Sequence, residues 1–512
     1  MASICCSESS KCSPKIYKGA FRNQVCVCNA TYCDQIEPLG YLKDGKAVIY
    51  RSDLDGDRLR RFTVKVLSGS KSDENVTISV NSGEKYQEIY GFGGAFTDAT
   101  GINLASLDRN IADKILEAYF TQEGLEYNIG RVPIASTDFS TREYSYADVP
   151  NDFDLQHFAL ADEDYKYKIP YIQKAQKMTS GNIRMFASPW SCPGWMKVNG
   201  RMRGGGEMKK DPKIYQAYAN YFVKFFEEYL KNGIPFWGVT VQNEPSSGAD
   251  ITYRWQTLNF TDETMRDFLM FYLGPTLKSN KITKDLKVMI LDDGRILLPG
   301  WADTIFNDPI ANQYADGVAV HWYGNLYSPA TTLDWTNERH PDKFILATEA
   351  CAGYFGHHGP IMGDWFRAES YADDIITDLN HHVTGWTDWN LCLDEIGGPN
   401  WAYNVVDAPI IVNKTSQEFY KQPMFYALGH FSKFFPKGSR RIGVKVDGNL
   451  AVSAAAVSVT GGRRSIVVLN KSSSPIRARL DDTTTGQYIL LDLPPRSIHT
   501  ANWQKPKTRK LL

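Results

Sequence analysis

The sequence lacks the long apolar stretches and the charge imbalance that mark several large classes of protein. No window of its 512 residues approaches the roughly 20 unbroken apolar residues that a membrane-spanning helix needs, so we do not expect an integral membrane protein. Lysine and arginine number 57 against 58 acidic residues, a formal charge of -1. The chain therefore has no general positive field for nucleic acid or anionic lipid, and no nucleic-acid partner is predicted.

The N-terminus also lacks a secretory signal. Residues 1–10, MASICCSESS, contain no apolar segment of the required kind. The printed start is therefore compatible with a mature chain behind an added methionine, or with a cytosolic product. The cysteines distinguish these two readings, because six of the nine fall within the first 33 residues.

Such crowding indicates disulfides formed in an oxidising compartment. Zinc is the alternative, but this segment has no histidine and offers Cys26-Val-Cys28 instead of a CxxC pair. We therefore predict no metal and no cofactor. Five N-glycosylation sequons agree with a secretory route: Asn29, Asn75, Asn259, Asn413 and Asn470.

Apolar residues make up 43% of the chain and charged residues 22%, as in soluble globular proteins. A chain of this length exceeds one compact core, so a large and a smaller domain are expected. Short alternating strands with Asp-Gly turns occupy residues 46–82 and return near the C-terminus, from GVKV to QYILLDL. A β-sandwich built from both chain ends would explain this pattern.

Between these ends, apolar strand-like runs alternate with amphipathic helices. Eight strands are predicted, around 87–96, 127–135, 181–188, 235–243, 286–292, 316–321, 343–349 and 384–390. The helix within 213–231 has one apolar face, formed by Ile214, Tyr218, Tyr221, Phe222, Phe225 and Tyr229. Eight such alternations favour a (β/α)8 TIM barrel of the α/β class. A doubly wound open sheet is the competitor, but GFGGAF at 91–96 lacks the GxGxxG spacing that it would normally show.

Polar and aromatic groups follow the predicted strands at their C-terminal ends. Any one acid there would be explained by a helix-capping role, but in a barrel all of them would meet at one mouth. They are Asp138, Trp190, Asn243, Glu244, Asp292, Asp293, His321, Trp322, Tyr323, Glu349, Trp386, Asp388 and Trp389.

The carboxylates Glu244 and Glu349 follow the fourth and seventh predicted strands. Glycoside hydrolysis needs such a pair, because one carboxyl group protonates the departing oxygen while the other attacks the anomeric carbon or activates water. Aromatic rings supply apolar platforms for the C–H faces of a sugar. The residue types therefore point to sugar chemistry.

The motifs together resemble the lysosomal glucosylceramidases (acid β-glucosidases) of glycoside hydrolase family 30. The resemblance covers nearly the whole chain and rests on eleven stretches in one order: QVCVCNATYCD, GFGGAFTDA, YNIGRVPIASTDFS, ASPWSCPGWMK, TVQNEPSSG, LDDGRILLPGW, AVHWY, TEACAG, GWTDWNL, GGPNW and FYKQPMFYALGHFSKF. A lone NEP would be weak evidence, since many barrel glycosidases share it.

The resemblance implies a retaining double displacement, with Glu244 as general acid/base and Glu349 as nucleophile. It assigns the 2-hydroxyl contact to Asn243 and the remaining glucose pocket to other residues: Asp138, Trp190 and Trp389, with Phe139, Trp322, Tyr323 and Asn404 at its wall or rim. It also suggests the disulfides Cys12–Cys26 and Cys28–Cys33. Cys5 and Cys6 are then additional, and Cys192, Cys351 and Cys392 are expected as buried free thiols.

The family's substrate, glucosylceramide, stays in a membrane, so the resemblance implies peripheral contact with lipid, a saposin-type activator and lysosomal delivery through the secretory pathway. An apolar lip is predicted from Tyr253, Trp255, Leu326, Tyr327, Tyr354 and Phe355. The loop GYFGHHGPIMGDW after Glu349 differs from the family pattern, which leaves the aglycone preference open. The implied domains are 1–38 with part of 391–422, 39–85 plus 436–512 as the sandwich, and 86–435 as the barrel.

Two alternatives stay open. A hydrolase of the same family could act on another sugar or linkage, as a β-xylosidase or a β-1,6-glucanase. A non-catalytic glycolipid-binding barrel would be a protein of a different class, although the presence of both carboxylates argues against it.

Overall fold

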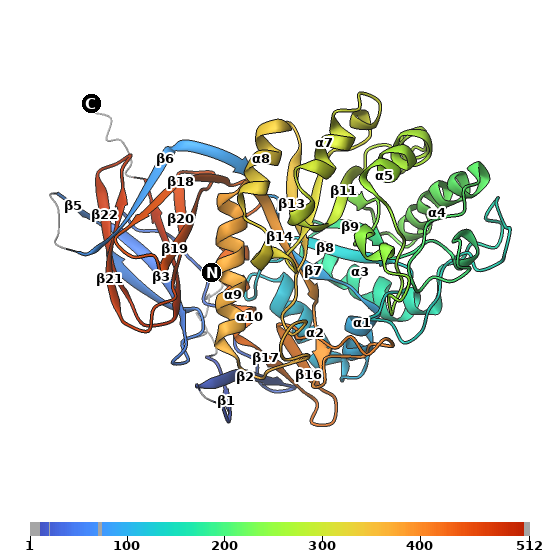
Figure 1. Cartoon of the computed structure of the whole chain (residues 1–512). Helices are drawn as coiled ribbons and strands as arrows, with labels where there is room; N and C mark the ends of the chain where they lie inside the picture. Colours follow the sequence, from blue (N-terminus) through green and yellow to red (C-terminus); the bar gives the residue numbers. More distant parts are fainter. Residues whose placement is uncertain (1–10, 20, 70–73, 506–512) are drawn as a thin grey trace, which may run out of the picture.

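The computed structural model describes residues 11–19, 21–69 and 74–505. It contains a closed barrel, a ten-stranded sheet and a five-stranded sheet (Figure 1). Cys5 and Cys6 lie outside the described residues. Strands from both ends of the chain lie together beside the barrel, with α9 and α10 between them and the barrel strands (Figure 1).

The barrel consists of eight parallel strands that close on themselves. They are β7 (Gly91–Ala95), β8 (Ile129–Ile134), β9 (Arg184–Pro189), β10 (Gly238–Thr240), β11 (Lys287–Gly294), β12 (Gly317–His321), β13 (Phe344–Glu349) and β14 (Val383–Asn390). Each overlaps one of the eight predicted regions, and the TIM-barrel prediction is confirmed. All eight strands point their C-terminal ends toward one mouth, which places the polar strand-end residues on the same face.

The glycines of β7 serve close backbone packing in place of phosphate binding. A Cβ atom on Gly93 would lie 1.9 Å from the carbonyl oxygen of Ile129 on β8. Gly91 has a φ of 138°, a backbone conformation that residues other than glycine rarely adopt. The glycine-rich stretch is therefore required by barrel closure.

Ten α-helices within the described residues complete this part of the fold. They are α1 (Asp98–Ala105), α2 (Arg109–Phe120), α3 (Ile169–Met178), α4 (Pro212–Lys231), α5 (Asp262–Phe268), α6 (Gly274–Ser279), α7 (Gly300–Phe306), α8 (Thr331–Arg339), α9 (Trp365–Asn380) and α10 (Pro423–Ser432). Helix α4 shows why the sequence dictates them: Asp211 caps its N-terminus by accepting from the backbone N–H of Lys213, and Pro212 occupies the first turn. The predicted apolar face of α4 is buried, as expected.

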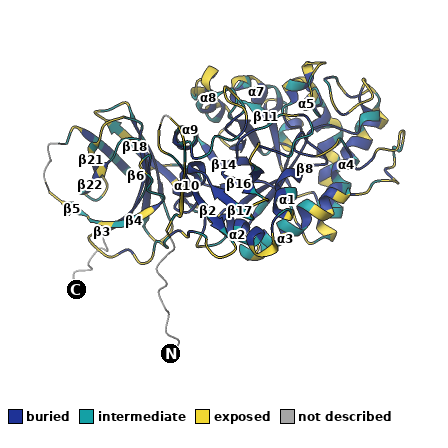
Figure 2. Ribbon diagram, turned by 90° about the horizontal axis from the view of Figure 1, so that it is seen from below, coloured by how far each residue is buried: buried dark blue, intermediate teal, exposed yellow. Residues whose placement is uncertain are grey.

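Apolar side chains fill the interior of the barrel. Ile129, Phe186, Met289, Ala319 and Leu346 come from five different strands and form one buried cluster. Buried residues line the barrel strands and the inner helix faces, whereas exposed residues lie on outer faces and loops (Figure 2). The floor beneath the polar mouth is therefore a packed core that keeps water out.

The ten-stranded sheet combines the two chain ends, in the order β4-β3-β23-β20-β19-β18-β6-β21-β22-β5. Its strands are β3 (Lys46–Asp53), β4 (Arg60–Lys65), β5 (Leu67–Ser68), β6 (Val76–Glu88), β18 (Arg440–Asp447), β19 (Val452–Ser458), β20 (Arg463–Asn470), β21 (Ile476–Asp482), β22 (Gln487–Leu493) and β23 (Ser497–Gln504). The sheet folds over one apolar cluster that includes Ile49, Ile78, Val468 and Leu480. The predicted sandwich from both ends is confirmed.

The five-stranded sheet pairs the N-terminal segment with a later part of the chain. It contains β1 (Pro14–Tyr17), β2 (Asn23–Asn29), β15 (Leu393–Asp394), β16 (Ile410–Asn413) and β17 (Glu418–Lys421). The disulfides Cys12–Cys26 and Cys28–Cys33 are both present, as expected. The exact domain boundaries given above stay a prediction.

The five sequons differ in accessibility. Asn75 is exposed, and Asn29, Asn259 and Asn413 are partly exposed. Asn470 is fully buried, and its Nδ2 donates to the carbonyl oxygens of Ser474, Leu493 and Pro494. The folded protein has no room for a glycan at Asn470, because the attachment atom itself is enclosed by the sandwich. No helix in the described parts of the chain has the length and apolar character to cross a bilayer.

Candidate active site

A cavity of about 210 Å³ opens at the barrel mouth; we name it the mouth cavity. It is small beside the ~300–1,000 Å³ of typical ligand pockets, as suits a single small ring. Its lining comprises Asp138, Phe139, Trp190, Asn243, Glu244, Trp255, Tyr323, Glu349, Cys351, Tyr354, Trp389, Asn404 and Val406. The structure thus brings both predicted carboxylates together with seven of the eight predicted substrate-binding residues.

Trp322 is the predicted residue that does not line this cavity. Its Nε1 donates to the carbonyl oxygen of Cys351 over 3.1 Å, and its ring packs edge-on against Tyr371, with centroids 5.1 Å apart. It lines a neighbouring cavity beside Leu326 and Phe355 instead. Trp322 lies next to Tyr323 in sequence, but the two side chains leave the backbone in different directions.

The backbone is strained where the strands end. Glu244 has φ 42° and ψ 58°, and Ala135, Leu291 and Asp292 also have positive φ. Each such non-glycine residue costs roughly 1–3 kcal/mol. The Glu244 backbone N–H donates to the carbonyl oxygen of Asp292 over 2.9 Å, and the turn continues into a short helix, Pro245–Ala249. The strained turn aims the Glu244 side chain into the mouth.

Glu349 is anchored by a cation and a hydroxyl group. Its Oε2 forms an ion pair with Nη1 of Arg131, and its Oε1 accepts from the hydroxyl of Tyr323 over 2.7 Å. Burial and the nearby Glu244 carboxylate raise the pKa of Glu349 above its ordinary value, although His321, Arg131 and Tyr323 oppose the rise. The two anchoring bonds stabilise the ionised carboxylate and fix its orientation.

Arg131 is the residue that sequence reasoning missed. Its side chain is fully buried, and its Nη2 donates to Asn243 over 2.8 Å and to Asp292 over 2.9 Å. A buried charge is costly unless it is paired, and Arg131 stands alone in the otherwise apolar strand β8, IGRVPI. That isolated charge was the available sequence signal for acidic partners at the mouth.

His321 links Glu244 to the buried charges. Its Nδ1 lies 3.2 Å from Glu244 Oε1 and its Nε2 lies 3.0 Å from Asp292 Oδ1. Both nitrogens face carboxylate oxygens, so both carry protons and the ring is a cation. Burial lowers the pKa of His321, but the Glu349, Asp292 and Glu244 carboxylates outweigh it and raise that pKa to about 10.

The charges of this cluster nearly cancel. Burial favours the neutral form of Asp292, yet Arg131 and His321 hold its pKa well below the ordinary range. Asp292, Glu349 and Glu244 therefore face two cations, and a single additional proton would make the group neutral. Glu244 is the most accessible of the three carboxylates, with 22% of its side chain exposed against 7% for Glu349. A proton exchanged with a ligand would pass most readily through Glu244.

The rest of the mouth cavity wall combines amides with flat rings. Asp138 Oδ2 accepts from Asn404 over 2.9 Å and from Asn400 over 3.1 Å. Trp190 and Trp389 stack with centroids 5.1 Å apart. Carboxylate and indole groups side by side suit a ring with hydroxyls at its edge and C–H bonds on its face.

Asp138 should make stability depend on pH. Burial raises its pKa from the ordinary 3.8 to about 7, with Glu349 and Glu244 adding to the rise and Asn404 and Asn400 opposing it. The protonated form is thus favoured in the folded state, so its stabilisation is complete below about pH 4 and is lost as pH rises to about 7. The loss is on the order of a few kcal/mol.

The measurement is the difference in unfolding free energy between the native chain and Asp138→Asn at several pH values. We expect the native chain to lose stability relative to the variant between about pH 4 and 7. Burial also raises the pKa of Asp407, to about 6. Asp407 is present in both proteins, so its contribution cancels in the difference between their unfolding free energies. Parallel curves across that window would contradict the assignment.

The three free thiols among the described residues, Cys192, Cys351 and Cys392, are all buried, as expected. Only Cys351 of these lines the mouth cavity, and its Sγ lies 3.2 Å from the Tyr323 hydroxyl oxygen. Burial raises the pKa of Cys351 well above its ordinary value, so the sulfur stays protonated and is a poor nucleophile.

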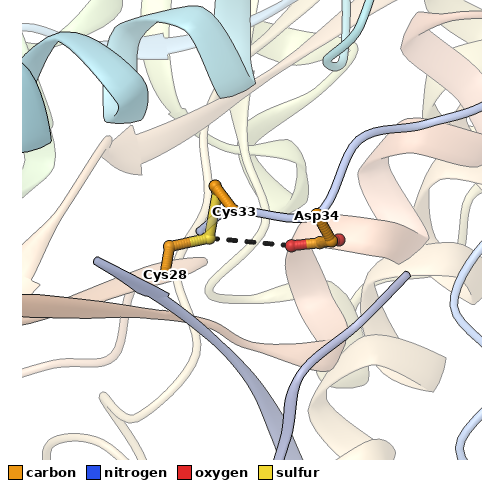
Figure 3. A group of neighbouring side chains, drawn as sticks. All are labelled: Cys28, Cys33 and Asp34. Carbon is orange, nitrogen blue, oxygen red and sulfur yellow. Dashed lines mark hydrogen bonds between the residues drawn. A yellow bond between two sulfur atoms is a disulfide. The ribbon is translucent and has the colours of Figure 1, made fainter. Parts of the chain in front are cut away.

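Two groups in the described parts of the chain bring three potential metal-binding atoms together. In Glu244, His321 and Glu349, these atoms lie within 4.8 Å of one another, but the His321 nitrogens carry protons that face carboxylates and Glu349 pairs with Arg131. The other group is Cys28, Cys33 and Asp34, in which Asp34 Oδ1 lies 3.6 Å from Cys28 Sγ (Figure 3). There the disulfide leaves no thiolate for a metal.

Comparisons with known proteins agree with this geometry. The "Glycosyl hydrolase family 30 TIM-barrel domain" matches residues 89–435, and the "Glycosyl hydrolase family 30 beta sandwich domain" matches residues 438–501. "Putative glucosylceramidase 3" of Caenorhabditis elegans is 68% identical over 98% of this chain and 96% of its own length. "Lysosomal acid glucosylceramidase" of Mus musculus is 44% identical over 96% of each chain.

Among solved structures, SrfJ from Salmonella typhimurium matches with a TM-score of 0.83 at 27% identity, covering 90% of this chain and 100% of that one. The barrel, the sandwich from both chain ends and the paired carboxylates at the mouth are thus accompanied by full-length sequence similarity. The chain is a glycoside hydrolase and belongs to glycoside hydrolase family 30.

Proposed function

We propose that this enzyme is a retaining β-glucosidase that hydrolyses glucosylceramide to glucose and ceramide through a covalent glucosyl-enzyme intermediate. One observation carries the proposal: Glu244 and Glu349 present carboxylate oxygens within 4.8 Å of each other in a small cavity walled by tryptophan and amide groups. Two relatives that match nearly the full chain, at 68% and 44% identity, are named as glucosylceramidases.

Glu349 is the proposed nucleophile. It attacks the anomeric carbon while its second oxygen stays paired with Arg131. Glu244 is the proposed general acid, which protonates the departing oxygen and then, as a base, takes a proton from the incoming water. Its greater exposure than that of Glu349 supports the proton-transfer role.

The short separation supports retention of configuration. Retaining glycosidases hold their carboxyl groups about 5–5.5 Å apart, whereas inverting enzymes leave about 6.5–9.5 Å for a water molecule. One oxygen of each carboxyl group within 4.8 Å of the other fits the shorter of these two spacings. Asn243, held by Arg131, is then placed for the 2-hydroxyl, and Asp138 for a hydroxyl at the far edge of the ring.

The proposed setting is the lysosome, reached through the secretory pathway, with a lipid surface as the site of action. The name of the mouse relative, the N-terminal disulfides and the accessible sequons support it. The saposin-type activator stays a prediction that rests on the family resemblance.

The apolar lip supports contact with lipid, although the exposed residues differ in part from the six that the sequence predicted. Of the six predicted residues, Leu326, Tyr327 and Phe355 are highly exposed, while the other three are partly buried. Three further exposed apolar residues lie on loops that follow β10 and β14: Ile251, Ile396 and Tyr403. Apolar side chains from four loops thus surround the mouth, a pattern typical of an interaction surface.

Hydrolysis in vesicles tests substrate and lip together. The native chain should release glucose from glucosylceramide in vesicles and from a soluble aryl β-glucoside. The double variant Leu326→Ser, Phe355→Ser should lose most of the vesicle activity, at least about tenfold, because buried apolar contact with lipid is lost, and should keep the aryl glucosidase activity. Leu450→Ser is the matched control, since Leu450 is fully exposed on the sandwich.

The outcomes separate the two claims. If the native chain cleaves aryl β-glucosides but no glucosylceramide, even in detergent, the substrate proposal is wrong. If it prefers aryl β-xylosides to aryl β-glucosides, the assignment of glucose as the sugar unit is wrong. Equal losses on both substrates in the double variant would refute the lip.

A further inference from the structure

A second cavity, of about 580 Å³, lies outside the barrel and shares no lining residue with the mouth cavity. Its walls come from the start of the N-terminal sheet, the segment 34–37 and the turn between β3 and β4. The N-terminal sheet and the sandwich therefore meet around it. We name it the junction cavity.

Cationic side chains outnumber acids around the junction cavity. Lys11, Arg22, Arg58, Arg60 and Arg61 line it together with Asp34, Glu37 and Asp57. The acids already have cationic partners: Asp34 lies 3.1 Å from Lys421, Glu37 lies 3.8 Å from Arg61, and Asp57 lies 2.8 Å from Arg51 and 3.5 Å from Arg60. The acids therefore leave part of the positive charge uncompensated.

Arg22 and Arg58 hold that uncompensated charge. Arg22 donates to the side-chain oxygen of Gln24 over 3.0 Å, and Arg58 donates only to carbonyl oxygens, those of Gln24, Asp53 and Asp57. Across residues 11–19, 21–69 and 74–505, neither guanidinium has a carboxylate partner within 4 Å. Burial lowers the pKa of Arg58 and the charge of Arg22 lowers it further, while Tyr426 and the more distant carboxylates of Asp53 and Asp57 oppose the fall. Two like charges therefore lie near each other here.

The Arg58 guanidinium has unused donors. Nη1 donates to two carbonyl oxygens and Nη2 to one, while Nε is buried with no acceptor. One Nη2 proton therefore also lacks an acceptor among the described residues. Unused guanidinium donors suit the oxygens of a phosphate or carboxylate group.

We propose that the junction cavity binds a phosphate ester, whose oxyanion lies between Arg22 and the unused donors of Arg58. An oxyanion would remove the repulsion between the two cations and accept from the orphaned Nε. The cavity is much larger than one phosphate group, so the ester should carry a polar group, and the carboxylates of Asp34 and Glu37 can accept from its hydroxyls. The ligand is thus a phosphorylated polyol, free or as a lipid headgroup.

A ligand here would stabilise the fold. Arg58 packs against the rings of Trp365 on α9 and Tyr426 on α10, with its guanidinium carbon 5.5 Å and 5.9 Å from the ring centroids. The same side chain therefore joins the β3–β4 turn, the N-terminal sheet and two barrel helices. Binding to the folded chain alone raises the unfolding temperature by mass action.

Thermal unfolding in the presence of phosphate tests the proposal with the full chain. Inorganic phosphate and glucose 6-phosphate should each raise the Tm saturably by a few degrees, measured against chloride at equal ionic strength. Arg22→Gln should weaken this response about tenfold, since one charge-assisted contact is lost. Arg22 is exposed and, among the described residues, its side chain bonds only to Gln24, so this variant should fold even if Arg58→Gln does not.

Arg109→Gln is the matched control, because Arg109 is an exposed arginine on α2 with 87% of its side chain accessible. This variant should respond to phosphate like the native chain.

Sedimentation with phosphatidylcholine vesicles containing phosphatidylinositol distinguishes a lipid headgroup from a free phosphate ester. More binding by the native chain than by Arg22→Gln indicates a lipid headgroup, and equal binding indicates a free ester. Absence of a Tm rise, or an undiminished rise in Arg22→Gln, would overturn the proposal. Activity on an aryl glucoside should be unchanged in Arg22→Gln, so failure here is independent of the proposed glycosidase function.

Discussion

Glu349→Gln should lower the turnover of an aryl β-glucoside by a factor on the order of 10⁴ or more. The amide is a poor nucleophile, so the covalent step is lost whatever the leaving group. The substitution also removes one of the two carboxylates that pair with Arg131, the other being Asp292. The buried cation is then less fully compensated, which lowers the stability of the site as well. Initial rates on a soluble aryl glucoside measure the effect.

The control is Glu395→Gln, which removes a carboxylate from an exposed position on a loop after β14 and should leave turnover unchanged. A 2-deoxy-2-fluoroglucosyl fluoride should accumulate as an adduct of the native chain, and peptide mapping should place it on Glu349. The first sugar product should have the β configuration. The proposed mechanism would be wrong if Glu349→Gln kept the native rate, if the adduct formed on another residue, or if the product had the inverted configuration.

Glu244→Gln should behave differently, because its proposed task is proton transfer. Turnover of glucosylceramide, whose alkoxide leaves poorly without a proton, should fall about 10²–10⁴-fold. A dinitrophenyl β-glucoside has a leaving group that needs no proton, so formation of its covalent intermediate should be nearly unimpaired. The glutamine can still accept or donate at the position where His321 and Tyr253 contact Glu244.

The contrast between the two leaving groups is the measurement. Pre-steady-state kinetics should show a burst of dinitrophenol followed by slow turnover, since the second step still lacks its base. Glu349→Gln is the internal comparison, because it should fail with both substrates. A loss of equal size on both substrates in Glu244→Gln would show that Glu244 acts through structure or binding and not as the proton donor.

The candidate site shows which residues a sequence can reveal. Glu244 and Glu349 could be named because each follows a recognisable strand, and parallel strands in a barrel end at one face. His321 could be placed at that face but its role could not be assigned, because the role depends on carboxylates from two other strands, Asp292 and Glu244. Arg131 was missed because its isolated charge within β8 signals buried acidic partners without showing which acids they are.

The limits of pattern reading are visible elsewhere in the fold. Strand β23 (Ser497–Gln504) was not predicted, since its sequence, SIHTANWQ, mixes polar and apolar residues. It nevertheless lies between β20 and β3, where Asn502 accepts from Ser465 and Thr500 bonds His430. Asn470 shows the same limit, because its sequon is intact in the sequence although the fold encloses its side chain.

The sequence by itself determined the alternation of strands and helices, the pairing of the chain ends, the family and the two carboxylates. These depend on local periodicity and on short motifs, which neighbouring residues specify. Only the tertiary structure decided the ionic state of His321, the position of Arg131 beneath the mouth, the departure of Trp322 from the cavity and the uncompensated arginines of the junction cavity. Charge interactions depend on distances between residues far apart in the chain and on the burial of each group, and only folding fixes both.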